Sequence, residues 1–180
     1  MSKVLIVAGA PASGKTVFST ALSKKLGFIV FDLDDRLPEF IENNHPQLEK
    51  VGIEQFLAEI RDIRYHDLIE RGVLALNAGQ SVILTAPFSQ EIQDHKRWTA
   101  LVSPFLEIGI EPQLIWIRTD HAKVRERMVA RGEMRDSEKV SSEETFNKYM
   151  QSANQNSPGV AHIEVDGASP IESQLQIPIR

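Results

Sequence analysis

The fold of this chain is decided by the stretch Gly9-Ala10-Pro11-Ala12-Ser13-Gly14-Lys15-Thr16. This stretch is a complete G-x-x-x-x-G-K-[ST] phosphate-binding loop. It follows a short apolar run at residues 3–8, which is typical of a buried strand, and it leads into residues 16–26, whose apolar positions have helical spacing. Strand, loop and helix thus follow one another as the motif requires. A Gly-rich turn before an ordinary helix is the weaker interpretation.

The residue types in the loop suit the binding of phosphate. Gly9 and Gly14 allow the backbone to curl, so that successive N–H groups point into one concavity at a helix N-terminus. Lys15 can reach the β- and γ-phosphates of a nucleotide, and Thr16 offers a hydroxyl to Mg²⁺. We therefore predict a nucleotide site formed by Gly9, Ala10, Pro11, Ala12, Ser13, Gly14, Lys15, Thr16 and Val17.

The length and composition of the chain argue against several classes of protein. A chain of 180 residues is expected to form one domain with a sizeable core. Its formal net charge of −5 argues against a large nucleic-acid surface. The absence of cysteine excludes a disulfide framework, and the histidines lack metal-binding spacing. Because no apolar run is long enough to span a membrane, a cytoplasmic protein without nucleic-acid or membrane partners is the default expectation.

Strands and helices alternate outward from the loop. Further strands are predicted at residues 28–32, 81–86, 113–118 and 160–165. Helices are predicted at residues 37–44, 53–71, 94–108, 119–132 and 141–153; Gly72 is expected to bend the second of these and Gly79 to end it. This alternation predicts an α/β fold, in which a five-stranded parallel sheet carries helices on both faces and binds ligands at the carboxyl ends of its strands.

An acidic segment, Phe31-Asp32-Leu33-Asp34-Asp35-Arg36, leaves the second predicted strand at the edge where the phosphate loop opens. In an extended segment the side chains of Asp32 and Asp34 point the same way. One carboxylate can then orient the water shell of Mg²⁺ while the other accepts a proton from a substrate hydroxyl. An acidic turn after a strand is the alternative, and the neighbouring phosphate loop favours the functional interpretation.

A basic stripe follows the fourth predicted strand. Lys123, Arg127 and Arg131 recur every four residues on a predicted helix, and Arg135 follows after Gly132. Phosphoryl transfer needs positive charge over the γ-phosphate, and arginines of a mobile segment commonly supply it. A solvated charged face near a helix C-terminus is the alternative. We predict that Arg127 and Arg131 contact phosphate.

With these three stretches, the chain resembles the small P-loop kinases of the nucleoside-monophosphate-kinase group, which include the shikimate and gluconate kinases. It resembles most the AAA-type, zeta-toxin-like ATP-binding proteins, and the resemblance covers nearly the full length. It implies a single P-loop NTPase domain with strand order 2-3-1-4-5, with ATP and Mg²⁺ as cofactors. It also implies a helical substrate-binding insertion at residues 36–78 and a lid region at residues 119–142.

The resemblance also implies residue roles. Thr16 and Asp32 would hold the metal, and Asp34 would contact or deprotonate the acceptor hydroxyl. Arg127 and Arg131 match the Arg-x-x-x-Arg of the family's lid, and the start of the lid together with the loop at residues 166–170 would grip the adenine. The implied catalytic residues are Lys15, Asp34, Arg127 and Arg131, and the candidate substrate contacts are Asp34, Arg61, Arg64 and Tyr65.

One departure from the family pattern keeps a second function open. Many relatives end the third strand with an aspartate that supports Mg²⁺, and this chain has Thr85 there. Either Asp32 carries the metal role or activity is weak, so a nucleotide-binding switch without a phosphoryl acceptor is the alternative to a kinase. A GTPase is disfavoured because Asn147-Lys148-Tyr149-Met150 lacks the aspartate of the base-recognition motif. The principal prediction is an ATP-dependent phosphotransferase acting on a small-molecule hydroxyl, for which no residue pattern singles out the acceptor.

Overall fold

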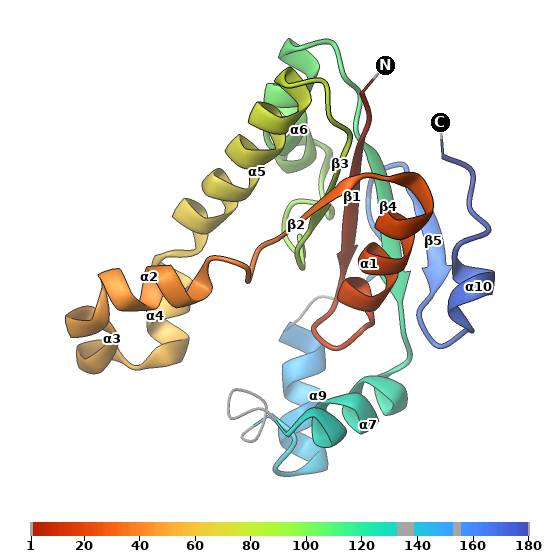
Figure 1. Cartoon of the computed structure of the whole chain (residues 1–180). Coiled ribbons are helices and arrows are strands. Elements are labelled where there is room, and N and C mark those ends of the chain that lie inside the picture. Colours follow the sequence, from red (N-terminus) through yellow and green to blue (C-terminus); the bar gives the residue numbers. More distant parts are fainter. Residues whose placement is uncertain (1, 133–138, 153–155, 180) are drawn as a thin grey trace.

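The computed structural model describes residues 2–132, 139–152 and 156–179. Five strands form one sheet in the order β2-β3-β1-β4-β5, and every neighbouring pair is parallel (Figure 1). This confirms the α/β fold and the strand order that were predicted. The strands are β1 (Val4–Gly9), β2 (Ile29–Asp32), β3 (Val82–Thr85), β4 (Gln113–Arg118) and β5 (Ile163–Asp166).

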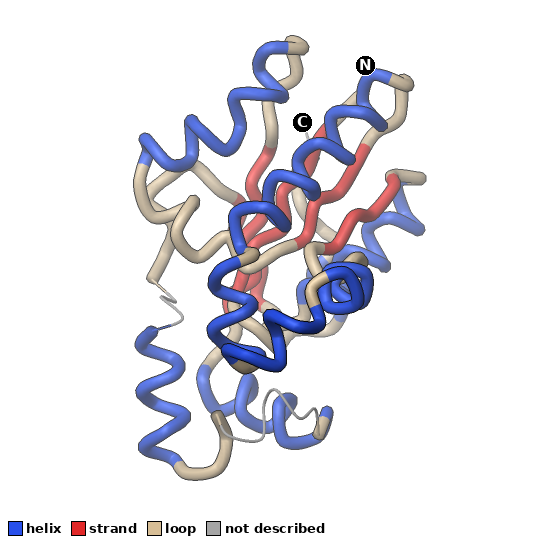
Figure 2. Tube along the Cα trace, turned by 90° about the vertical axis from the view of Figure 1, so that its left-hand side faces the viewer, coloured by secondary structure: helices blue, strands red, loops and turns tan. Residues whose placement is uncertain are grey.

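Helices surround this sheet and occupy both of its faces (Figure 2). None of the described helices is long and apolar enough to cross a bilayer. The helices are α1 (Lys15–Leu26), α2 (Leu37–Asn43), α3 (His45–Val51), α4 (Ile53–Glu59), α5 (Arg61–Asn77), α6 (His95–Glu107), α7 (His121–Arg131), α9 (Glu143–Ser152) and α10 (Ile171–Gln174).

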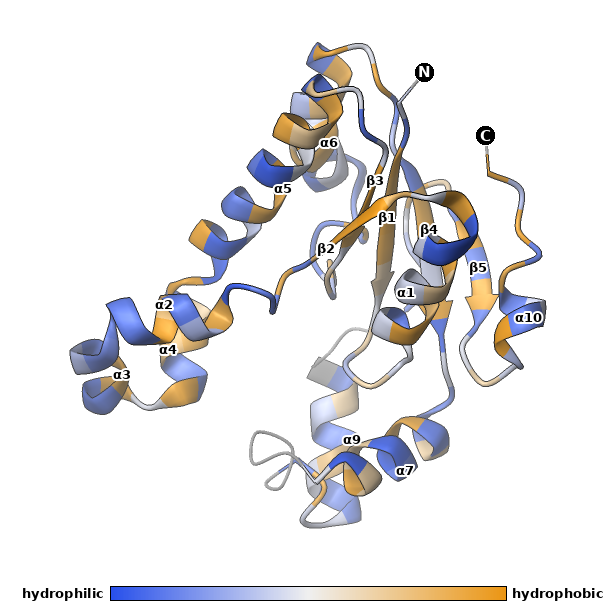
Figure 3. Cartoon of the chain, viewed as in Figure 1, coloured by the Kyte–Doolittle hydropathy of each residue, from blue (hydrophilic) through white to orange (hydrophobic). Residues whose placement is uncertain are grey.

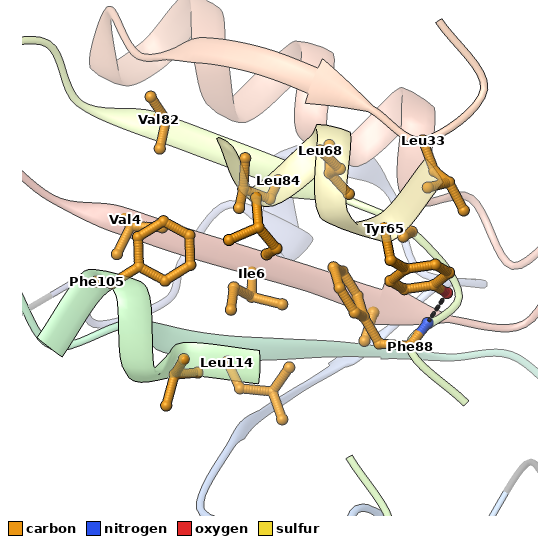
Figure 4. Close-up of a cluster of buried hydrophobic side chains, with 14 of the residues drawn as sticks. Val4, Ile6, Leu33, Tyr65, Leu68, Val82, Leu84, Phe88, Phe105 and Leu114 are labelled. Carbon is orange, nitrogen blue, oxygen red and sulfur yellow. Dashed lines mark hydrogen bonds between the residues drawn. The ribbon is translucent and has the colours of Figure 1, made fainter. Parts of the chain in front are cut away.

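The alternation of side chains along β1 separates two cores. Val4, Ile6 and Ala8 join the cluster under α5 and α6, whereas Leu5 and Val7 join the cluster under α1 and α10. Figure 4 shows part of the first cluster, in which side chains from the sheet meet those of α5 and α6. Because both faces are covered, the central strands β1, β3 and β4 read as largely continuous apolar runs, as expected for a parallel sheet, whereas the edge strand β5 alternates apolar and charged residues. The hydropathy colouring in Figure 3 shows the apolar strands enclosed by more polar helices.

The segment between β2 and β3 differs in detail from the sequence prediction. The helix expected at residues 53–71 is two helices, α4 and α5, which are separated at Ile60, and Gly72 leaves α5 unbroken to Asn77. Gly72 is buried against β3, where an added Cβ atom would lie 3.1 Å from Leu84 Cδ2. The close packing of α5 on β3 therefore explains why a residue without a side chain stands at this position. A helix that was not predicted, α3, begins at His45. Pro46 does not prevent it, because Pro46 lies in the first turn, where proline is tolerated.

The helices α7 and α9 lie together beyond the carboxyl ends of the strands (Figure 1). Asp120 caps α7 by accepting a hydrogen bond from Lys123 N, and Ser142 accepts one from Thr145 N at the start of α9. A small apolar cluster joins these two helices, and the partly buried Ala12 of the phosphate loop packs against it. Its buried members are Val124, Met128, Phe146 and Met150.

Candidate functional site

The phosphate loop joins β1 to α1 and is shaped by close backbone packing. A Cβ atom at Gly9 would lie 2.7 Å from Ile117 O, so no larger residue fits there. Gly14 has a φ of 106°, in the left-handed region that favours glycine, and it stands immediately before α1. The loop therefore brings its backbone to the N-terminus of α1, where the helix dipole favours an anion.

Lys15 is the first residue of α1, and its side chain folds back over the loop. Lys15 Nζ donates hydrogen bonds to Gly9 O at 2.8 Å and to Ala10 O at 2.7 Å. These contacts hold the ammonium group against the backbone that is predicted to surround the phosphates. The position suits a point charge that shifts a short distance to a β- or γ-phosphate oxygen.

Thr16 and Asp32, which are predicted to hold the metal, lie together at the carboxyl edge of the sheet. Thr16 Oγ1 donates to Asp32 Oδ2 at 3.4 Å, and Asp32 Oδ1 accepts from Asp34 N at 3.0 Å. Hydroxyl and carboxylate oxygens are the ligands that Mg²⁺ takes from proteins. Among the described residues, no group of three or more His, Asp or Glu side chains can hold a metal. This donor set fits Mg²⁺, which keeps several waters and binds through one or two protein oxygens and the substrate phosphates.

Burial raises the pKa of the Asp32 carboxyl, and the neighbouring carboxylates of Asp34 and Asp35 raise it further. The hydrogen bond from Asp34 N and the charge of Lys15 act in the opposite direction without cancelling the rise. In the folded protein without metal, ionisation of Asp32 is therefore less favourable than in the unfolded chain. A bound cation would reverse this balance, as is common where a site is built for function at the expense of stability.

We expect Asp32→Asn to raise the melting temperature of the metal-free protein at neutral pH. The folded state holds a proton on Asp32 more tightly than the unfolded state does, because the pKa of Asp32 is higher in the folded state. As the pH rises from the unfolded pKa through the folded pKa, Asp32 therefore lowers the free energy of unfolding, and this loss is complete above the folded pKa. The gain should therefore vanish in acid, below both pKa values. In the same variant Mg²⁺-dependent ATP binding should weaken by at least about tenfold.

Thermal melts across pH and titrations of ATP with and without Mg²⁺ measure these two effects. Asp62→Asn is a suitable control, because the Asp62 side chain is 95% exposed on α5. A lower melting temperature for Asp32→Asn at neutral pH, with Mg²⁺ dependence unchanged, would assign Asp32 to the fold alone.

Thr85 stands beside this pair at the end of β3, in register with Asp32. The side chain is fully buried, and its hydroxyl lies 2.8 Å from the hydroxyl of Ser19 in α1. Thr85 thus ties β3 to the helix that follows the phosphate loop. Because its hydroxyl is paired with Ser19 and carries no charge, Thr85 is not a candidate metal ligand, and a metal role for Thr16 and Asp32 stays a prediction.

The second carboxylate of the acidic segment points to the helices between β2 and β3. Asp34 Oδ1 accepts from Arg64 Nη2 at 2.6 Å, and the same nitrogen donates to Leu33 O at 3.0 Å. The Arg64 side chain is 8% exposed, while that of Asp34 is 50% exposed. The structure therefore brings together two of the residues predicted to contact the acceptor, with the guanidinium buried and the carboxylate accessible.

Arg61 and Tyr65, the other two predicted acceptor contacts, hold the loop that follows β3. Arg61 Nη2 donates to Glu91 Oε1 at 2.5 Å, and the Arg61 guanidinium lies 4.4 Å from the centre of the Tyr65 ring. The Tyr65 hydroxyl accepts from Phe88 N at 3.1 Å (Figure 4), and Phe88 has a φ of 49°. Burial, together with the charge of Glu91, raises the pKa of Tyr65 to about 12. A direct contact of either residue with an acceptor stays a prediction.

We expect Tyr65→Phe to destabilise the protein by about 1–3 kcal/mol, because the buried N–H of Phe88 loses its acceptor. Phe88 needs this bond in particular, since a bulky residue with positive φ is strained. Denaturant unfolding of both proteins measures the change. Unchanged stability with a raised KM for the acceptor would show instead that the Tyr65 hydroxyl serves the substrate.

Arg127 reaches from α7 to the phosphate loop. Arg127 Nη1 donates to Ser13 O at 2.9 Å, and Nη2 donates to Gly167 O at 2.7 Å. The predicted lid helix is thereby joined both to the phosphate loop and to the loop after β5 that is predicted to grip the adenine. Arg131 is exposed at the end of α7, and its contact with phosphate stays a prediction. Arg135 lies outside the described residues.

Sequence reasoning missed the charged side chains that surround the acidic segment. Arg71 Nε pairs with Asp67 Oδ2 at 3.0 Å, and Arg71 Nη1 lies 3.8 Å from Asp35 Oδ2. Asp67 also pairs with Arg36. The residues 64, 67 and 71 share one helical face, and this spacing is the signal that could have found them. Glu91 lies in a loop, where no periodic pattern marks it.

Comparisons with known proteins agree with this architecture. Residues 4–155 match the family described as an AAA domain. Solved structures with a similar fold include a gluconokinase from Sinorhizobium meliloti 1021 (16% identity, 97% of this chain and 87% of that chain, TM-score 0.64) and a sugar kinase from Janibacter sp. HTCC2649 (15%, 98% and 91%, 0.63). A shikimate kinase from Bacteroides thetaiotaomicron is also similar (14%, 97% and 94%, 0.56). At these identities the likeness shows the fold alone, and no curated protein matches the sequence.

Proposed function

Since this chain belongs to the AAA domain family, we propose that it is a kinase that transfers the γ-phosphate of Mg-ATP to a hydroxyl group of a small molecule. One observation carries the proposal. The acidic segment contacts the phosphate loop on one side, through Asp32 and Thr16, and the predicted acceptor-binding insertion on the other, through Asp34 and Arg64. A phosphotransferase needs its nucleotide and acceptor sites to meet at one place, and this segment joins them.

The predicted phosphate-binding, metal-binding and lid residues each have a role in this proposal. The phosphate loop and Lys15 bind the β- and γ-phosphates, and Thr16 and Asp32 hold Mg²⁺. When bound, the metal neutralises negative charge that develops on the phosphate oxygens during transfer. Arg127 and Arg131 add positive charge from the lid region. These roles supply positioning and electrostatic stabilisation, which account for most of the catalysis in phosphoryl transfer.

Asp34 serves the acceptor in the proposed step. The acceptor hydroxyl oxygen forms a bond to the γ-phosphorus, the bond from the γ-phosphorus to the β–γ bridging oxygen breaks, and ADP leaves. The hydroxyl proton passes to the Asp34 carboxylate and from there to solvent. Arg64 orients this carboxylate from its buried position on α5.

The experiment that tests the proposal is phosphate transfer from γ-labelled ATP with Mg²⁺. The panel of acceptors contains sugars, polyols, nucleosides and aminoglycosides, beside a reaction without acceptor. We expect label on one class of acceptor, which would establish the kinase and its substrate class together. Label that appears on none of them, in a protein that binds ATP, would count against the proposal.

A nucleotide-binding switch is the second candidate, and Thr85 favours it. Because β3 ends in Thr85, β3 contributes no carboxylate to the proposed metal site, and the Thr85 hydroxyl itself is buried against Ser19. A weakly held metal suits slow hydrolysis better than rapid transfer. Slow ATP hydrolysis at the same rate with and without every acceptor is the result that would select the switch.

A further inference from the structure

The carbonyl group of Ser13 is the point where three distant segments meet the phosphate loop. Ser13 O accepts hydrogen bonds from Thr119 Oγ1 at 2.8 Å and from Arg127 Nη1 at 2.9 Å. Thr119 follows β4, and the residue is buried, with only 4% of its surface exposed. Because Asp120 caps α7, the Thr119 hydroxyl is not used as a helix cap.

Gly167, from the loop after β5, closes this junction. A Cβ atom at Gly167 would lie 2.2 Å from Thr119 Oγ1 and 2.5 Å from Ser13 O, so the backbone of Gly167 packs directly on the Thr119–Ser13 hydrogen bond. Arg127 Nη2 binds the carbonyl of the same glycine. The orientation of the Ser13 carbonyl is therefore fixed by contacts on several sides.

Fixing this carbonyl also fixes the next N–H group. All described peptide bonds are trans, and in a trans peptide the C=O of one residue and the N–H of the next point in opposite directions. With Ser13 O held toward Thr119 and Arg127, the N–H of Gly14 is turned to the other side of the loop. Gly14 is the residue that enters α1, where the loop backbone is expected to face the phosphates.

Thr119 is better placed than Arg127 to keep this orientation. Its backbone directly follows β4, which pairs with β1 and with β5, and its side chain is short. Arg127 acts from the lid helix through a long side chain that loses more conformational freedom when it is held. We infer that Thr119 is a positioning residue that aims the Gly14 N–H at a nucleotide phosphate; this inference rests on the proposed nucleotide site.

The test compares the affinity of the full chain for ATP, ADP and adenosine by titration calorimetry. Thr119→Val should weaken ATP and ADP binding by about tenfold, the effect of losing one oriented hydrogen bond, and should leave adenosine binding unchanged. Thr119→Ser keeps the hydroxyl and should restore the affinity. Thr119→Ala removes the hydroxyl without placing a methyl group against Ser13 O, and it replaces the valine variant if that one does not fold. Thr99→Val is the control, because the Thr99 hydroxyl binds its own helix at His95 O.

The outcomes separate this inference from the proposed function. If the wild-type protein binds neither ATP nor ADP, the nucleotide site itself is wrong, and the inference falls with it. If the wild type binds both and the Thr119 variants bind them equally well, only the inference is overturned. An equal loss of ADP and adenosine affinity that serine does not rescue would reduce Thr119 to a residue that merely supports the fold.

Discussion

Lys15→Ala is expected to lower phosphoryl transfer by at least about 10²–10³-fold while the fold stays intact. In the structure the ammonium group is held by two loop carbonyls, Gly9 O and Ala10 O, from which it can move to the phosphates. Alanine leaves the loop backbone in place and removes the positive charge that stabilises the transferring group. Steady-state turnover and circular dichroism of the variant measure activity and fold separately.

Lys24→Ala provides the matched control, since Lys24 is exposed near the other end of the same helix. It removes an equal charge from α1 and should leave turnover unchanged. Near-normal turnover in Lys15→Ala would show that the phosphate loop does not take part in phosphoryl transfer. An unfolded variant would be recognised by its spectrum, and Lys15→Met, which keeps the length of the side chain, would then take its place.

Asp34→Asn is expected to lower acceptor phosphorylation by about 10²–10⁴-fold, the range for a positioned general base. Asparagine retains an oxygen that can accept from Arg64 Nη2, so the buried guanidinium keeps a partner. ATP binding should change little, because Asp32 and Thr16 are untouched. The comparison of kcat for the acceptor with the dissociation constant of Mg-ATP measures this separation.

Glu70→Gln is the control for this charge change, because Glu70 is exposed on α5. If Asp34→Asn weakens ATP binding and transfer equally, Asp34 belongs to the metal site or to the fold. If transfer is unaffected, the acceptor hydroxyl loses its proton without Asp34, and the proposed step must be revised.

The sequence predicted those elements whose residues are close together in the chain, namely the phosphate loop and the buried strands. The phosphate loop is a contiguous motif, and the apolar runs at residues 3–8 and 81–86 have the buried pattern of parallel strands. The pairing of Asp32 with Thr16 followed from the loop and the strand edge, because both lie where the sheet ends. The alternation of strands and helices predicted the parallel α/β sheet. The order of the strands in that sheet was predicted from the family resemblance and not from the residues themselves.

Contacts between residues far apart in sequence escaped prediction. Thr119 meets Ser13 across a separation of 106 residues, and nothing near Thr119 marks its hydroxyl for the phosphate loop. The break between α4 and α5 at Ile60 has no proline or glycine to signal it. The pairing of Arg64 with Asp34 depends on how α5 packs against β2, which periodicity alone does not show.

The central claim is that this protein hands phosphate to an acceptor rather than to water. The most direct measurement is the division of γ-label between acceptor and free phosphate in one reaction of the wild-type protein with Mg-ATP. We predict that, with an acceptor of the right class, most of the label appears on the acceptor and that ATP consumption rises with acceptor concentration. Label found only in free phosphate, at a rate that no acceptor in the panel changes, would contradict the account.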